Sequence, residues 1–158
     1  MSEAAPDHVG SVALGSDHGG FKAKELLKTH LGSLGYRVTD VGTHSTESVD
    51  YPDLALKVAR AVASGAADRG IMVDGAGIGS SMVCNKVRGI RAALCYDLKT
   101  AANSREHNDA NVLTLGGPLH APDALCEIAR VWLSTPFAGG RHWPRINKMM
   151  AVERGTNG

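Results

Sequence analysis

The sequence has few cysteines, little net charge and no long hydrophobic run, and each absence excludes a class of protein. Cys84, Cys95 and Cys126 are odd in number, widely spaced and without a CxxC pair, so they predict reduced, buried thiols rather than a disulfide framework or a zinc site. The formal net charge is +1, which offers no attraction to a polyanion and excludes nucleic acid as a partner. No apolar run approaches the ~20 residues that span a bilayer, so we expect no membrane segment.

The length and composition fit one globular domain. The chain has 158 residues, of which 43% are apolar and 21% are charged, and a domain of this size buries roughly two-thirds of its unfolded surface without needing disulfides. Residues 1–10 carry early acids and no apolar core, so they are not a secretory signal, and we expect a disordered lead there. We expect the domain itself over residues 11–153, a frayed tail over residues 154–158, and a cytoplasmic location.

Short apolar runs alternate with helical patterns along the chain. The runs that predict β-strands are Ser11–Gly15, Tyr36–Val41, Ile71–Val73, Arg91–Cys95 and Val112–Leu115. Helical spacing or a helix-starting proline predicts helices over residues 21–34, 54–62, 98–107 and 145–153, from Pro122 onward, and from the end of the loop DGAGIGSS to about Lys86. Five buried strands separated by helices indicate an α/β fold, a three-layer α/β/α sandwich around a five-stranded parallel sheet.

Three polar or glycine-rich segments follow strands of the predicted sheet. Asp17-His18 follows the first strand, Asp74–Ser80 the third, and Gly116-Gly117 the fifth. Ligands of parallel sheets bind beyond the carboxyl ends of the strands. We therefore expect the functional site where these three segments meet.

The segment DGAGIGSS places Gly75, Gly77 and Gly79 between a strand and a helix. Glycines let backbone come close to a ligand, and a helix N-terminus offers unpaired N–H groups, so the loop suits a phosphate or a developing enediolate oxygen. The pattern G-x-G-x-G is not the dinucleotide fingerprint, and no P-loop lysine follows it. A tight turn without any ligand is the alternative for the loop taken alone.

Asp74 lies at the mouth of this loop, at the carboxyl end of the third strand. A carboxylate is ionised at neutral pH, and partial burial brings it into the range of a general base. Its alternative role is structural, as a helix cap or a group that holds the loop.

Two histidines lie at element ends, each next to a carboxylate, in Asp17-His18 and in His107-Asn108-Asp109. Histidine titrates near neutrality, so it can pass a proton to a sugar oxygen or bind phosphate. A histidine at a helix end is otherwise a favourable partner of the helix dipole.

Arg141 and Arg145 lie four residues apart near the C-terminus. On a helix they share a face, and paired guanidinium groups match phosphate oxygens. The alternative is a solvated basic edge. No histidine or cysteine cluster has metal-ligand spacing, so we expect neither a metal nor another cofactor.

The motifs taken together resemble one known family, the type B ribose-5-phosphate isomerases, which are grouped with the galactose-6-phosphate isomerase subunits. The resemblance covers roughly residues 11–153 and rests on GSDHGGFKAKELL, DVGTHSTESVDYPDLA, GAGIGSSMVCNKVRGIRAALCYD, SREHNDANVLTLGG and GGRHWPRI, in that order. It implies a Rossmann-like homodimer, or dimer of dimers, with sites at the subunit interface. It also implies metal-free ring opening of a phosphorylated sugar, followed by proton transfer through a cis-enediol, in carbohydrate metabolism.

The resemblance also implies roles for residues at matching positions. His107 and Asn108 would come from the neighbouring subunit. The implied roles are ring opening (Asp17 and His107), phosphate binding (His18, Arg141 and Arg145), contact with the sugar or the enediolate (Gly75, Gly77, Gly79, Ser80 and Asn108) and proton abstraction (Asp74).

The chain departs from the family pattern at three positions. Asp74 replaces the cysteine that is the base in many members, and Ala76 replaces a hydroxyl residue that often shuttles protons between the sugar oxygens. Pro118 replaces a phosphate-binding arginine, for which His120 is a partial substitute. A carboxylate base is compatible with enediol chemistry, since triosephosphate isomerase uses a glutamate for the same step.

Three hypotheses follow. The first is an active isomerase of a tetrose, pentose or hexose phosphate with Asp74 as the base. The second is a protein that binds a phosphosugar without isomerising it, because base, shuttle and phosphate anchor have all changed. The third, a nucleotide-binding protein, rests only on the glycine loop and lacks the acidic residue of a true dinucleotide site.

Overall fold

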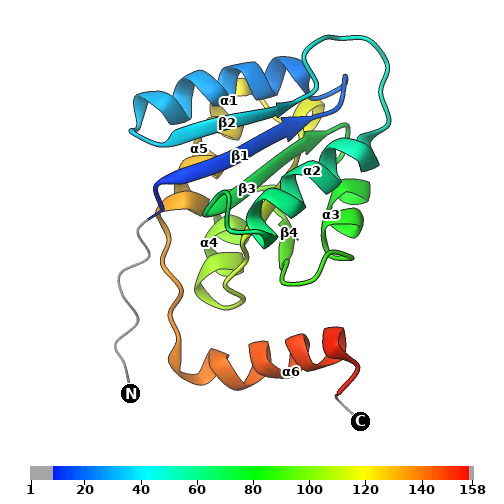
Figure 1. The fold of residues 1–158 in the computed structure, drawn as a ribbon. Coiled ribbons are helices and arrows are strands. Elements are labelled where there is room, and N and C mark those ends of the chain that lie inside the picture. Colours follow the sequence, from blue (N-terminus) through cyan, green and yellow to red (C-terminus); the bar gives the residue numbers. More distant parts are fainter. Residues whose placement is uncertain (1–8, 157–158) are drawn as a thin grey trace.

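A computed structural model describes residues 9–156, and within them five parallel strands form one sheet in the order β2-β1-β3-β5-β4 (Figure 1). The strands are β1 (Ser11–Ser16), β2 (Arg37–Gly42), β3 (Arg69–Asp74), β4 (Ala92–Leu94) and β5 (Val112–Gly116). The helices are α1 (Phe21–Ser33), α2 (Tyr51–Ala63), α3 (Ile78–Cys84), α4 (Leu98–Glu106), α5 (Pro122–Ser134) and α6 (Trp143–Arg154), with 3-10 turns at Gly117–Leu119 and Gly140–His142. The predicted α/β sandwich with a five-stranded parallel sheet is confirmed.

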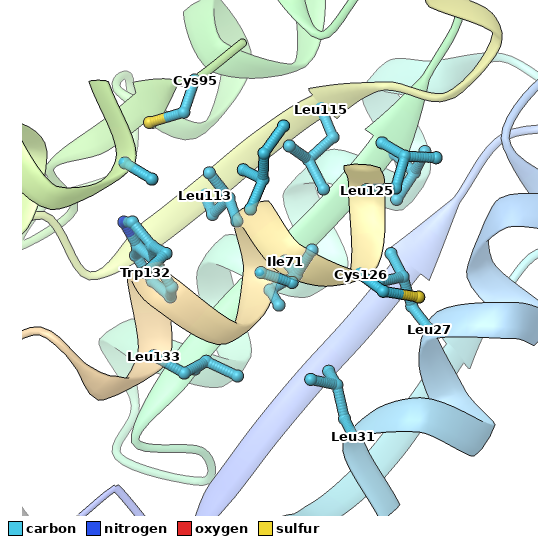
Figure 2. Packing of buried hydrophobic residues seen from close by; sticks show 14 of the residues in the cluster. Leu27, Leu31, Ile71, Cys95, Leu113, Leu115, Leu125, Cys126, Trp132 and Leu133 are labelled. Atoms are coloured by element: carbon cyan, nitrogen blue, oxygen red, sulfur yellow. The ribbon is translucent and has the colours of Figure 1, made fainter. Parts of the chain in front are cut away.

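Apolar side chains cover both faces of the sheet. On one face, α1 and α5 pack onto the sheet through residues such as Leu31 and Trp132, which belong to the same buried cluster as Leu113 (Figure 2). On the other face, Val58 of α2 packs with Met72 of β3. Because each fully buried large aliphatic side chain stabilises the fold by about 1.5–3 kcal/mol, these two clusters hold the strand ends in fixed positions.

Element boundaries differ from the predicted ones where charged residues or glycine enter regular structure. β3 begins at Arg69 rather than Ile71, and Gly70 is needed there because a Cβ would lie 2.7 Å from Val58 Cγ1. The predicted tail begins inside α6, which runs to Arg154 and ends on Gly155 with a φ of +70°. Such a left-handed glycine is a common helix end.

The predicted disordered lead falls mostly on residues 1–8, which lie outside the described residues, as do residues 157 and 158 of the predicted tail. Gly10 is part of the fold, since its N–H donates to Asp68 Oδ2 over 2.8 Å and its carbonyl accepts from the Arg37 N–H. In residues 9–156, none of the helices has the length and apolar character that a bilayer crossing requires.

Candidate active site

The three segments predicted to share one edge of the sheet do meet there. The Asp17 N–H donates to the carbonyl of Val73 over 3.2 Å. A Cβ at Gly20 would lie 2.2 Å from that same carbonyl oxygen, and a Cβ at Gly116 would lie 2.9 Å from Ala76 Cα. Only glycine permits such contacts, so the turn after β1, the loop after β3 and the end of β5 pack backbone against backbone.

The glycine loop exposes unpaired N–H groups. Gly77 has a φ of +76°, which a side chain rarely adopts, and this turn directs the chain into α3. In the part of the chain that the structure describes, the N–H groups of Gly75, Ile78 and Gly79 have no hydrogen-bond partner. Three free donors at a helix start form the kind of cradle that stabilises a developing oxyanion.

Asp74 is buried, 4% exposed, and its carboxylate is engaged by the loop that follows it. Oδ1 accepts the N–H of Ala76 over 3.1 Å and the N–H of Gly77. Oδ2 accepts the N–H and the hydroxyl of Ser80 over 3.3 and 2.5 Å. The carboxylate thus holds the loop in place, which is the structural role given above as the alternative to a general base. The hydroxyl of the buried Ser80 faces Asp74.

Asp17 and His18 lie beside this loop with different exposure. Asp17 is buried, and its Oδ1 accepts the Gly20 N–H over 3.0 Å. His18 is exposed, and its Nδ1 accepts the Val49 N–H over 3.1 Å. A neutral imidazole has one donor nitrogen, so this bond leaves His18 Nε2 as the N–H donor, which suits a phosphate oxygen.

A second group of predicted residues lines one open pocket: His107, Asn108, Arg141 and Arg145, together with Asn103 and His142. The Asn103 Nδ2 and His107 Nδ1 atoms are 3.0 Å apart. The rings of His107 and His142 stack with their centroids 4.3 Å apart and their planes at 17°. His107 is therefore held from two sides.

Positive charge surrounds this pocket. Burial, and then the proximity of His107, Arg141 and Arg145, lower the pKa of His142, which favours the neutral form of its ring. Asn103 and His142 were not among the residues predicted from the sequence. Asn103 lies on α4 and precedes His107, which directly follows the helix, by four residues. This spacing places two side chains on one helix face, so that signal was present in the sequence.

The two groups lie at opposite edges of the sheet within one chain. Strands of a parallel sheet all run one way, so the intervening helix returns to the edge where the next strand begins. Arg91, just before β4, donates to the Asn108 carbonyl over 3.1 Å, and the Asn111 N–H, just before β5, donates to the Arg91 carbonyl over 2.9 Å. His107 and its neighbours therefore lie at the amino edge, whereas the glycine loop lies at the carboxyl edge.

Two further predicted positions lie at the carboxyl edge. Pro118, which replaces the expected arginine, is exposed in the turn after β5. His120 lines a small, mostly apolar pocket that also includes Lys22 and Gly19. Over the described ranges, no three side chains of histidine, cysteine, aspartate or glutamate gather as a metal ion requires.

Comparisons with known proteins agree with this architecture. Residues 12–149 match the family described as ribose/galactose isomerase. Ribose-5-phosphate isomerase B of Escherichia coli (strain K12) is 42% identical over 146 residues, which cover 92% of this chain and 98% of that protein.

Solved structures of similar proteins superpose closely on this one. Ribose-5-phosphate isomerase B of Clostridium thermocellum has a TM-score of 0.90 at 49% identity, covering 92% of this chain and 98% of that one. The enzyme of Mycoplasma genitalium, solved with bound ribulose-5-phosphate, has a TM-score of 0.89 at 37% identity, covering 93% and 99%.

Proposed function

Because the chain belongs to the ribose/galactose isomerase family, we propose that it interconverts an aldose phosphate and a ketose phosphate. The substrate is ribose 5-phosphate or a related tetrose, pentose or hexose phosphate. The observation that carries the proposal is the glycine loop, with free N–H groups at Gly75, Ile78 and Gly79, at the same edge of the sheet as the buried carboxylate of Asp17. Donors and an acid–base group at one edge are what enediol chemistry requires.

The complete site needs two copies of the chain. Its halves lie at opposite edges of the sheet, one with Asp17, His18 and the glycine loop, the other with His107 and Arg145. A homodimer, or a dimer of dimers, brings the carboxyl edge of one subunit to the amino edge of its partner. We place this assembly in the cytoplasm.

The reaction then follows from the groups in each half. Asp17 and His107 assist ring opening, in which the anomeric hydroxyl loses a proton and the ring oxygen gains one. A proton then moves from carbon 2 of the aldose to carbon 1 through a cis-enediol, whose oxygen charge the loop N–H groups stabilise. Arg141, Arg145 and the Nε2–H of His18 hold the phosphate, and Asn108 hydrogen-bonds the sugar.

Asp74 is the proposed base for the transfer between carbons. Its two oxygens already accept bonds from Ala76, Gly77 and Ser80, so proton abstraction requires the Ser80 hydroxyl to rotate away from Oδ2. This same observation favours the second candidate function, a protein that binds the phosphosugar without isomerising it.

Proton NMR in heavy water on a panel of four-, five- and six-carbon aldose and ketose phosphates tests the proposal. We expect deuterium to enter carbon 1 or 2 of one sugar, and we expect Asp74→Asn to abolish this exchange while the exposed Asp123→Asn on α5 leaves it unchanged. Exchange that survives Asp74→Asn contradicts the base assignment. Binding of a phosphosugar with no exchange in the unaltered protein supports the second candidate.

A further inference from the structure

The turn that follows α4 is held by two arginines that no step of the proposed reaction uses. This turn carries His107 and Asn108 and ends at Asp109, which has a φ of +47°, in the left-handed region that few non-glycine residues adopt. Arg105, 1% exposed, donates to Asp109 Oδ1 over 2.9 Å and to the Ala110 carbonyl. The turn is therefore fixed from inside the protein.

Arg91 holds the same turn from the other side. Its Nε donates to the carbonyls of Asn108 and Asp109 over 3.1 and 3.2 Å, and its Nη2 donates to the Asp109 carbonyl over 2.9 Å and to Asp109 Oδ2 over 3.3 Å. The Arg91 side chain is only 17% exposed. Charged hydrogen bonds at such partly buried positions are stronger than surface pairs.

Arg91 also reaches α6, the helix that carries Arg145. Its Nη1 lies 3.6 Å from Met150 Sδ, and next to it the Gly89 N–H donates to both carboxylate oxygens of Glu153 over 3.1 and 3.2 Å. Figure 1 shows α6 set apart from the two helical layers, so these contacts fasten it to the start of β4. One guanidinium thus contacts the His107 turn and the helix of Arg145 at once.

We propose that Arg91 is a positioning residue, which keeps His107 and Asn108 in register with Arg145 on α6. The inference rests on the proposed function, because it concerns how one half of the shared site is aligned. Lysine cannot replace Arg91, since a single ammonium cannot reproduce the fork that reaches two carbonyls and a carboxylate together. A misplacement of about 1 Å in groups of this kind costs about a hundredfold in rate.

The experiment compares Arg91→Met with Arg130→Met, an exposed arginine on α5 paired with Glu127. We expect Arg91→Met to lower kcat/KM about a hundredfold, with KM raised and kcat lowered together, and to weaken the binding of inorganic phosphate. Arg91→Lys recovers little of this loss, and Arg130→Met changes neither parameter. If Arg91→Met lowers only the fraction of active protein and leaves KM and the phosphate affinity unchanged, the proposal is overturned.

A double variant separates positioning from general damage. If Arg91 acts through His107, Arg91→Met costs much less in kcat when His107→Ala is already present, whereas independent effects add. Additive losses overturn the proposal. Should Arg91→Met fail to fold, Asp109→Asn tests the same contact, because asparagine tolerates the left-handed backbone. It should lower kcat/KM less than Arg91→Met and be non-additive with His107→Ala, and an unchanged kcat/KM overturns the proposal.

Failure of the proposed function is distinguishable from failure of this inference. Turnover by the unaltered protein is measured first. If no sugar is turned over, the proposed isomerase function is contradicted, but the positioning role of Arg91 is not. The positioning role is then judged by the affinity for inorganic phosphate. Weaker phosphate binding in Arg91→Met than in Arg130→Met supports it, and equal binding overturns it.

Discussion

The hydroxyl of Ser80 is the clearest point at which the glycine loop can be perturbed. It is completely buried and donates over 2.5 Å to Asp74 Oδ2, and Asp74 is itself 4% exposed. Ser80→Ala removes that donor but leaves the Ser80 N–H bond to the same oxygen intact. A hydrogen bond to a charged group contributes about 1.5–3 kcal/mol, so the free energy of unfolding should fall by about that amount at neutral pH.

Urea denaturation at a fixed protein concentration measures this loss, because the proposed assembly would make the apparent stability depend on concentration. Ser81→Ala is the matched control, since the Ser81 hydroxyl makes no hydrogen bond within residues 9–156. We expect Ser81→Ala to change stability by no more than about 0.5 kcal/mol. If Ser80→Ala costs no more than the control, the Asp74 carboxylate does not depend on this hydroxyl, and our description of the loop is wrong.

Two pH measurements test the electrostatics away from the loop. Burial and nearby positive charge lower the pKa of His142, so its NMR titration midpoint should lie below the ordinary histidine value of about 6.5. The stability that the neutral ring contributes should be lost as the pH falls from that ordinary value through the lowered pKa, and a midpoint at or above the ordinary value contradicts this. Burial alone would raise the pKa of Asp40, but hydrogen bonds from Lys24 and Lys28 lower it from 3.8 to about 2. Stability measured by thermal denaturation should therefore fall between pH 4 and 2, and it should fall less in Lys24→Met than in the unaltered protein. An equally steep fall of stability with pH in both proteins would refute the pairing of Lys24 with Asp40.

Much of the fold was predictable because buried apolar runs and punctuating glycines are local signals. The strand over Ile71–Val73 was found for that reason, whereas Arg69 and Gly70 were missed because a charge and a glycine carry no strand pattern. Gly70 belongs to the strand because it pairs with Ala13 of β1 and Val112 of β5, and it must be glycine because Val58 packs closely above it; both are tertiary contacts.

The sequence motifs indicated candidate site residues, but the geometry that relates them was less predictable. The glycine loop, Asp17 and His107 were identified from motifs. The stacking of His107 on His142 depends on how the chain returns after α5, so no local pattern reports it. The engagement of Asp74 by its own loop had a local signal, since its partners lie within six residues, and the structural role was one of the two considered.

Subunit complementation tests the central claim, a sugar-phosphate isomerase whose site is shared between two copies, most directly. Asp17→Asn damages the carboxyl edge and His107→Ala the amino edge, so each variant alone has no intact site. After the two are unfolded together and refolded in equal amounts, half of the dimers are mixed and one of their two sites is intact, so deuterium exchange should recover to about a quarter of the unaltered rate. No recovery above the separate variants would contradict the shared site, because each damaged group would then belong to a site within its own chain.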